Sequence, residues 1–281
     1  MFFLIYHIKN TCIMYYMKSI IAVIMAGGLG KRMNSSLPKV LHKISGIPMI
    51  CHILLKLKVL SNIVNINKIL IVVGKNKDVI KAELDSCSDI LPDIEYVTQD
   101  EPLGTGHAIQ CCINDLIGFP ESEILILSGD VPLLQLSTMN KLVNMNEKVK
   151  LITTRINDPT GYGRIIEVNE KFDKIIEQKD CNRRELEVKE INCGIYAIKS
   201  EYLCKYLPQL KNNNSQNEYY LTDIIEIIKR EEGFDVGMLK IPQENVYEIL
   251  GVNTIEQLKE LEKLIIKNKI ESKNIYENND I

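Results

Sequence analysis

The sequence predicts an α/β fold built on a doubly wound, Rossmann-like and mainly parallel sheet. Three apolar runs lack the polar alternation of half-exposed strands, which is typical of strands buried on both faces. They lie at Ile20–Met25, Lys68–Val73 and Ile124–Leu127. Segments with helical spacing of apolar residues separate these runs, and strands that alternate with helices form parallel sheets.

The other elements of the first half fit this alternation. Helices are expected at Pro48–Leu60, Lys77–Leu84 and Gly106–Leu116, and a short strand at Ile94–Val97. In a doubly wound sheet, ligands bind outside the carboxyl ends of the strands. The segments that follow Met25 and Leu127 are therefore expected to face one site.

The pattern changes after about residue 150. Short strands joined by turns are expected at Lys150–Arg155, Gly163–Val168, Phe172–Glu177 and Ile191–Ile198, which makes the whole sheet mixed. Helices are expected at Tyr219–Arg230 and Ile255–Lys269. The polar residues 270–281 are expected to fray, as chain ends commonly do.

Composition narrows the class of protein. The 281 residues carry a net charge of −3, so no basic field points to nucleic acid. None of the eight cysteines forms a CxxC pair, which disfavours zinc and redox motifs and favours reduced thiols in the cytoplasm. Residues 1–17 are apolar but too short and too broken to span a membrane, and they lack the features of a secretory signal. We expect an extension at 1–17, a domain at 18–255, and a C-terminal helix and tail at 256–281.

A glycine-rich loop follows the first strand. Its glycines allow backbone N–H groups to approach an anion, and Arg32 and Lys39 follow as cations. The dinucleotide fingerprint fails because Met33 stands where its third glycine belongs. The P-loop fails because Arg32, not Ser or Thr, follows Lys31. An anion site and a plain strand-to-helix turn both stay open on this loop alone.

Asp130 ends the apolar strand Ile124–Leu127 within the segment SGD. A carboxylate at such a strand end is suited to Mg²⁺, which takes oxygen ligands and shares phosphate oxygens. Aspartate is also a common helix N-cap. Both interpretations stand on this residue alone.

Several segments together are more specific. They are Met25–Met33, Leu37–Leu41, Gln99–Ala108, Gly129–Leu133, Asp158–Arg164, Glu177–Asp180, Glu190–Asn192, Glu218–Asp223 and Gly251–Asn253. In this order they resemble the sugar-phosphate nucleotidyltransferases, and in particular the pyrophosphorylase (uridylyltransferase) domain of the bacterial GlmU enzymes, over about residues 18–260. The resemblance implies a GT-A-like fold with a small sugar-binding subdomain.

The same resemblance implies a reaction. UTP and N-acetylglucosamine 1-phosphate would yield UDP-N-acetylglucosamine and pyrophosphate, with Mg²⁺ as cofactor. Two alternatives stay open: a uridylyl- or thymidylyltransferase for another hexose 1-phosphate, and a non-catalytic regulator that binds a sugar nucleotide. The segments GYGR, EINCG and EYYLTD favour the N-acetylated sugar. The left-handed β-helix acetyltransferase of the bifunctional enzymes has no counterpart here, so no acetyl-CoA chemistry, no membrane partner and no particular oligomer are predicted.

Residue roles carry over from the resemblance. Arg32 and Lys39 are the implied catalytic cations, and Asp130 and Asn253 the implied metal ligands. The implied sugar contacts are Gly163, Glu177, Asn192 and Asn253. The implied nucleotide contacts are Met25, Ala26, Gly27, Gly28, Lys39, Gln99, Gly104, Thr105, Ser128, Gly129 and Asp130. His107 is expected to stabilise the start of its helix rather than act as a base, and Arg164 to form a structural ion pair. Lys179 is either a phosphate partner or a surface lysine.

Overall fold

A computed structural model describes residues 4–8, 11–15, 18–28 and 30–265. Its main sheet has nine strands in the order β11-β10-β12-β8-β3-β6-β7, with β9 between β12 and β13. Two small antiparallel sheets, β1-β2 and β4-β5, complete the strands. The strands are β1 (Leu4–Ile8), β2 (Thr11–Tyr15), β3 (Ser19–Met25), β4 (Lys43–Ile44), β5 (Ile47–Pro48), β6 (Asn65–Val73), β7 (Glu95–Thr98), β8 (Glu123–Ser128), β9 (Val149–Arg155), β10 (Arg164–Val168), β11 (Lys171–Ile176), β12 (Glu190–Lys199) and β13 (Gly237–Ile241).

Helices connect and cover these strands. The α-helices are α1 (Met49–Leu60), α2 (Lys77–Asp85), α3 (Thr105–Gln110), α4 (Ile113–Leu116), α5 (Leu136–Asn144), α6 (Ser200–Tyr206) and α7 (Thr222–Glu232). The 3-10 turns are η1 (Lys31–Met33), η2 (Lys39–Leu41), η3 (Gln178–Asp180), η4 (Glu185–Glu187), η5 (Leu207–Gln209) and η6 (Gln243–Ile249). A last helix occupies 255–265 of the described chain. Within the described part, none of the helices is both long and apolar enough to cross a membrane.

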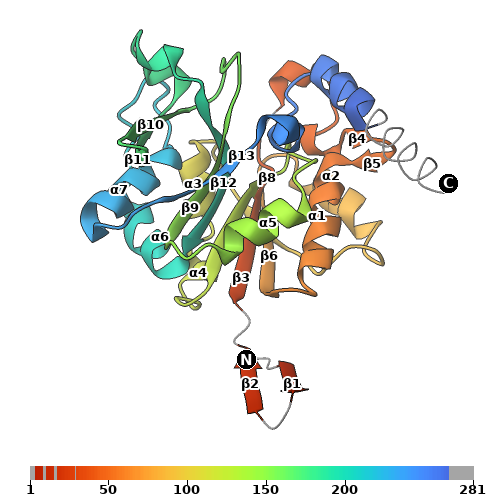
Figure 1. Ribbon diagram of the computed structural model, residues 1–281. Coiled ribbons are helices and arrows are strands. Elements are labelled where there is room, and N and C mark those ends of the chain that lie inside the picture. The colour runs from red at the N-terminus through yellow and green to blue at the C-terminus, as the bar shows by residue number, and fades with distance from the viewer. Residues whose placement is uncertain (1–3, 9–10, 16–17, 29, 266–281) are drawn as a thin grey trace, which may run out of the picture.

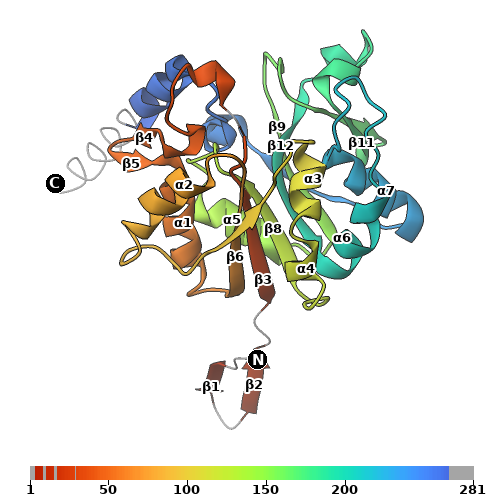
Figure 2. The ribbon, with the colours of Figure 1, turned by 180° about the vertical axis from the view of Figure 1, so that it is seen from behind.

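The centre of the sheet is parallel and covered on both faces. Strands β8, β3, β6 and β7 run parallel to one another. In β3, Ile20, Ala22 and Ile24 face one hydrophobic core with α1, α2 and α5. Ile21 and Val23 face the other core with α3, α4, α6 and α7. Figures 1 and 2 show these two helical layers on opposite faces of the sheet. The predicted α/β class with a mixed, mainly parallel sheet is confirmed.

Strand β12 changes neighbours where it reaches the site. Its residues Tyr196–Lys199 pair with β8, and Tyr196–Ile198 also pair with β9 on the other side. The register then breaks between Asn192 and Tyr196, and Ile191 pairs with Arg164 of β10. Gly194 sits inside this break with φ +69°, a conformation that glycine adopts without strain. Asn192 lies at the edge of this break, where it still pairs with Thr153 of β9.

Two predicted helices differ from the observed ones, and helices α5 and α6 and strand β13 were not predicted. The helix expected at Gly106–Leu116 is two short helices, α3 and α4. Helix α7 begins at Thr222 rather than Tyr219, because the Tyr219 backbone instead pairs with Leu103 and Gly106 at 2.8 and 2.7 Å. The extension predicted at the N-terminus contains the β1-β2 pair. The tail predicted at 270–281 lies outside the described residues.

Candidate active site

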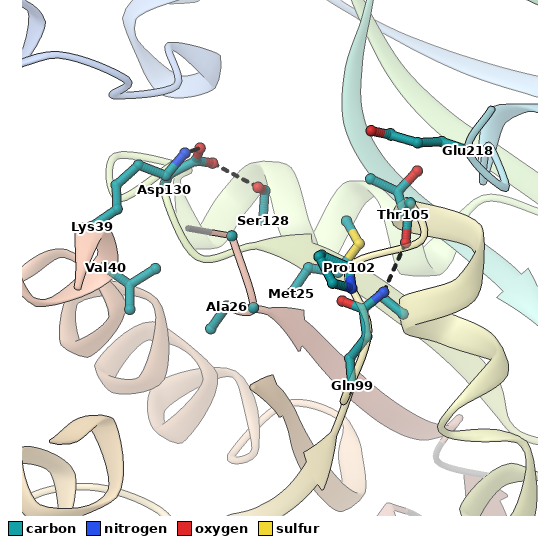
Figure 3. A pocket seen from close by; sticks show the side chains of 14 residues that line it. Met25, Ala26, Lys39, Val40, Gln99, Pro102, Thr105, Ser128, Asp130 and Glu218 are labelled. Carbon is teal, nitrogen blue, oxygen red and sulfur yellow. Dashed lines mark hydrogen bonds and ion pairs between the residues drawn. The ribbon is translucent and has the colours of Figure 1, made fainter. Parts of the chain in front are cut away.

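Two adjoining cavities lie at the carboxyl ends of β3 and β8. The glycine-loop cavity, about 270 Å³, is lined by Ala26, Gly27 and Gly28 on one side and by Gln99 and Gly104 on the other. Figure 3 shows its side chains. The β12-break cavity, about 310 Å³, is lined by residues that include Gly163, Glu177 and Asn192. Both cavities share Met25, Thr105, Ser128 and Asp130. A substrate with two parts could therefore span them.

The glycine loop continues the line of β3 beyond the sheet. The Ala26 N–H donates to Val72 O at 2.8 Å, which holds the loop against β6. A Cβ at Gly27 would lie 3.2 Å from Gln99 Oε1, whereas one at Gly28 would meet nothing within 4 Å. Gly129 lines neither cavity: its N–H donates to Met25 O at 2.9 Å, and a Cβ there would approach that oxygen at 3.0 Å. Gly129 thus packs behind the wall that its neighbours form.

The opposite wall is built from a pinned loop. Gly104 has φ +115°, and a Cβ there would lie 2.6 Å from Tyr219 O, so only glycine fits. The Gln99 side chain is 7% exposed. Its Nε2 lies 3.0 Å from Gly104 O and 3.1 Å from His107 Nδ1. This wall therefore presents a fixed amide to the glycine-loop cavity.

A cluster of cations and oxygens stands where the cavities meet. Lys39 forms an ion pair with Asp130, and its Nζ donates to Asn253 Oδ1 at 3.2 Å. Arg32 Nη2 donates to the same amide oxygen at 2.9 Å, and Ser128 Oγ donates to Asp130 Oδ1 at 2.6 Å. Figure 3 shows Lys39, Asp130 and Ser128 pointing toward one another. Five residues from three separate parts of the sequence thus converge on one point.

The cluster suits a hard divalent cation. The described residues contain no group of three or more His, Cys, Asp or Glu side chains that could hold a metal ion. The chain instead brings together one carboxylate and one amide oxygen, from Asp130 and Asn253. Mg²⁺ is commonly held by one or two protein oxygens and completes its shell with water and substrate phosphates. The donor set fits such an ion.

Asn253 is positioned by the start of the last helix. Gln257 Oε1 accepts from the N–H groups of Asn253 and Thr254 at 2.7 and 3.2 Å, and Gln257 N–H donates to Thr254 Oγ1 at 3.2 Å. This is a capping box, in which side chains and backbone N–H groups of the first turn satisfy one another. Val252 N–H also donates to Asp130 O at 2.9 Å. Gln257 was not predicted as a site residue, although the spacing T-x-x-Q is visible in the sequence.

Replacing Gln257 with alanine should loosen Asn253. We expect a loss of about 0.5–2 kcal/mol of stability in urea unfolding, as for other helix caps. Mn²⁺ binding followed by electron paramagnetic resonance should weaken in parallel. The exposed Glu260 on the same helix provides the control, since Glu260→Ala should leave Mn²⁺ affinity as it is. Equal Mn²⁺ affinity in Gln257→Ala and the wild type would contradict this role of the cap.

The β12-break cavity is lined by all four predicted sugar contacts, which are Gly163, Glu177, Asn192 and Asn253. Glu177 Oε1 accepts from Thr222 Oγ1 at 3.0 Å, and burial raises the pKa of the Glu177 carboxyl. Asn192 Nδ2 donates to Tyr196 OH at 2.7 Å, which leaves its amide plane fixed beside the break. A Cβ at Gly163 would lie 3.1 Å from Ile175 Cγ2 and 3.5 Å from Glu177 Oε1. Thr222 was missed by the sequence analysis, and it forms part of the same wall.

The structure thus places all but one of the predicted site residues on a cavity wall, the exception being Gly129. Arg164 is buried and donates to Tyr162 O and Gln178 Oε1, so its structural partners are neutral groups instead of the expected ion pair. The exposed Lys179 lines neither cavity. His107 lies within the first turn of α3, which has no side-chain cap hydrogen bond, and its Nδ1 lies 3.1 Å from Gln99 Nε2.

Comparisons with known proteins show the family of the chain. The model of the family described as "Nucleotidyl transferase" matches residues 21–242. A protein of Acanthamoeba polyphaga mimivirus named "Probable UDP-N-acetylglucosamine pyrophosphorylase" is 42% identical over 250 residues, which cover 86% of this chain and 94% of the relative. The bifunctional protein GlmU of Clostridium botulinum (strain Loch Maree / Type A3) is 40% identical over 259 residues, 90% of this chain. The chain spans about half of that relative, 53% of its length.

A solved structure supports the fold. The UDP-glucose pyrophosphorylase complexed with UDP-glucose superposes with a TM-score of 0.69 at 18% identity. The alignment covers 90% of this chain and all of the other chain. The sequence match over most of the chain, together with the two cavities at the strand ends, leads to one conclusion: the chain belongs to the nucleotidyl transferase family.

Proposed function

We propose that the protein is a UDP-N-acetylglucosamine pyrophosphorylase, which transfers UMP from UTP to N-acetylglucosamine 1-phosphate and releases pyrophosphate. The observation that carries the proposal is the position of the Lys39–Asp130–Asn253 cluster between two cavities. One cavity offers bare backbone and an amide to a nucleoside, and the other offers Glu177 and Asn192 to a sugar. The names of the two relatives support the same substrates.

The reaction would be an in-line displacement. An oxygen of the sugar phosphate forms a bond to the α-phosphorus of UTP, and the bond from that phosphorus to the pyrophosphate oxygen breaks. Phosphate monoesters are ionised near pH 7, so neither a protein nucleophile nor a general base is required. Catalysis then rests on positioning and on neutralising charge, which Arg32 and Lys39 are placed to do.

Mg²⁺ is the proposed cofactor, held by Asp130 and Asn253. Bound there, it would neutralise phosphate charge on the triphosphate. Ser128 fixes the Asp130 carboxylate by its hydrogen bond of 2.6 Å, and the capping box fixes Asn253. The seven cysteines from Cys51 to Cys204 are free thiols, which agrees with a cytoplasmic location for the proposed activity.

A pyrophosphate-release panel tests the proposal. UTP, dTTP and CTP are each combined with N-acetylglucosamine 1-phosphate, glucose 1-phosphate and N-acetylgalactosamine 1-phosphate, with Mg²⁺ or with EDTA. We expect the highest kcat/KM for UTP with N-acetylglucosamine 1-phosphate, and no release with EDTA. A preference for glucose 1-phosphate would replace the proposed sugar. Binding of UDP-sugar without any pyrophosphate release would identify a regulator instead of an enzyme.

A further inference from the structure

We propose that His107 is a positioning residue that sets base specificity through Gln99. The proposal rests on the proposed function in one respect, namely that a nucleoside triphosphate occupies the glycine-loop cavity. His107 itself does not line the glycine-loop cavity. It holds the Gln99 amide in one orientation, so that the amide can offer the base an acceptor and not a donor.

The hydrogen bonds of Gln99 distinguish its amide nitrogen, Nε2, from its amide oxygen, Oε1. Gly104 O can only accept, so the group 3.0 Å from it is the amide nitrogen. The same nitrogen lies 3.1 Å from His107 Nδ1. An amide nitrogen has two N–H groups and no lone pair to offer, so these two acceptors use both of them. His107 Nδ1 must therefore be unprotonated, and its Nε2 carries the ring proton.

Two other side chains lie close to the imidazole. Its Nε2 lies 4.0 Å from Cys111 Sγ, one helical turn further along the chain. Its ring lies 6.3 Å from the Tyr219 ring at an interplanar angle of 36°. The Tyr219 backbone is tied to Leu103 and Gly106, which flank the Gly104 carbonyl. The ring and the Gly104 carbonyl thus belong to one hydrogen-bonded unit.

With both N–H groups committed, Oε1 is the free end of the amide. It points toward Gly27, since a Cβ on that residue would lie 3.2 Å away from it, and Gly27 and Gln99 line the same cavity. An acceptor at this point matches a base that presents a ring N–H, as uracil does at N3. Cytosine presents a lone pair at its N3, and two facing lone pairs in a buried site are unfavourable. The orientation of Gln99 therefore favours uracil over cytosine.

A matched pair of substitutions separates this role from a merely structural one. In His107→Asn the amide oxygen reaches the place of Nδ1, so the acceptor is kept. In His107→Gln the longer side chain carries its amide to the place of Nε2, so the acceptor for Gln99 is lost. Cys111→Ala is the control on the other side of the ring. Dissociation constants for UTP and CTP are measured by calorimetry with Mg²⁺, and kcat and KM for UTP by pyrophosphate release.

We expect His107→Gln to weaken UTP binding about three- to tenfold, the worth of one lost hydrogen bond, and to lower the UTP-to-CTP preference by a similar factor. The loss should fall on KM for UTP, with kcat at saturation changed less than about twofold, since the reacting phosphates lie elsewhere. His107→Asn should bring back most of the preference, and Cys111→Ala should match the wild type.

Three results would overturn the role of His107. One is an unchanged UTP-to-CTP preference in His107→Gln. Another is a loss in His107→Asn as large as in His107→Gln. The third is a wild type that binds neither nucleotide, which would also remove the nucleotide from the cavity. If the wild type binds UTP but no sugar phosphate releases pyrophosphate, the proposed reaction fails, while the binding comparison still decides the role of His107.

Discussion

Replacing Lys39 with methionine is expected to lower kcat about 100- to 1,000-fold, the usual effect of removing one preorganised charge from a reacting centre. The Lys39 ammonium lies at the junction of the two cavities, where the reacting phosphates would meet. Methionine keeps much of the side-chain volume but removes the charge. KM for the sugar phosphate should change much less, because Glu177 and Asn192 form a separate wall. Steady-state kinetics with both substrates varied would measure the two effects.

The same substitution should have an opposite effect on metal binding. Lys39 Nζ contacts both Asp130 and Asn253, the two residues whose oxygens are proposed to hold the cation. A divalent ion must displace this ammonium before it can bind. Lys39→Met should therefore bind Mn²⁺ more tightly than the wild type when no nucleotide is present, as seen by electron paramagnetic resonance.

Lys43→Met is the matched control for both measurements. Lys43 lies four residues away in the sequence, is exposed, and pairs across 3.8 Å with Glu83, and neither residue lines either cavity. It should leave turnover and Mn²⁺ affinity unchanged. Near-normal turnover in Lys39→Met would remove Lys39 from the chemistry. Weaker Mn²⁺ binding in that variant would show that the ammonium does not compete for the metal ligands.

The sequence is most informative where a local pattern determines the structure. Strands β3, β6 and β8 are buried on both faces, so their apolar runs do not alternate and can be recognised directly. Because parallel strands end at one edge of the sheet, the residues after Met25 and Leu127 were expected to meet, and they do. Arg32 and Lys39 could be recognised only as cations after the glycine loop, and Asn253 carries no local signal. Their convergence followed from the resemblance.

Other features depend on long-range pairing. The expected start of α7 was too early because Tyr219 has good helical neighbours in sequence but pairs with Leu103 and Gly106 in space. The β12 break needs Tyr196 and Ile191 to take different partners, which no periodicity encodes. Strand β13 is five residues long and depends on β9 for its pairing. The link from His107 to Gln99 likewise appears only when the loop is folded.

Replacing Glu123 with glutamine is expected to destabilise the protein by about 3–5 kcal/mol, because it would leave a buried lysine without its counter-charge. Glu123 and Lys150 are almost fully buried at the amino ends of β8 and β9, opposite to the active site. Glu123 pairs with Lys150 and also with Lys18, whose Nζ lies 3.0 Å from Glu123 Oε2. The Glu123 carboxylate is therefore the counter-charge of two ammonium groups.

Lys150→Met should cost less than Glu123→Gln, because Lys18 still balances the carboxylate when Lys150 is gone. The double variant Glu123→Leu with Lys150→Met should regain much of the stability lost in Glu123→Gln, since an apolar replacement of a buried pair is often neutral. Urea unfolding of the three variants would give this order. A larger loss in Lys150→Met than in Glu123→Gln would contradict the shared carboxylate.

The Glu123→Gln variant should also gain stability as the pH rises. Burial is the first cause that lowers the pKa of Lys150, and Lys18 lowers it further, while contact with Glu123 favours the charged form. Without Glu123, the folded state holds fewer protons than the unfolded state between the lowered pKa and the ordinary lysine value. Stability then increases with pH across that window. As the pH is raised, the urea midpoint should rise more steeply for Glu123→Gln than for the wild type. If the urea midpoints of the two proteins changed in parallel with pH, Glu123 would not hold the proton on Lys150.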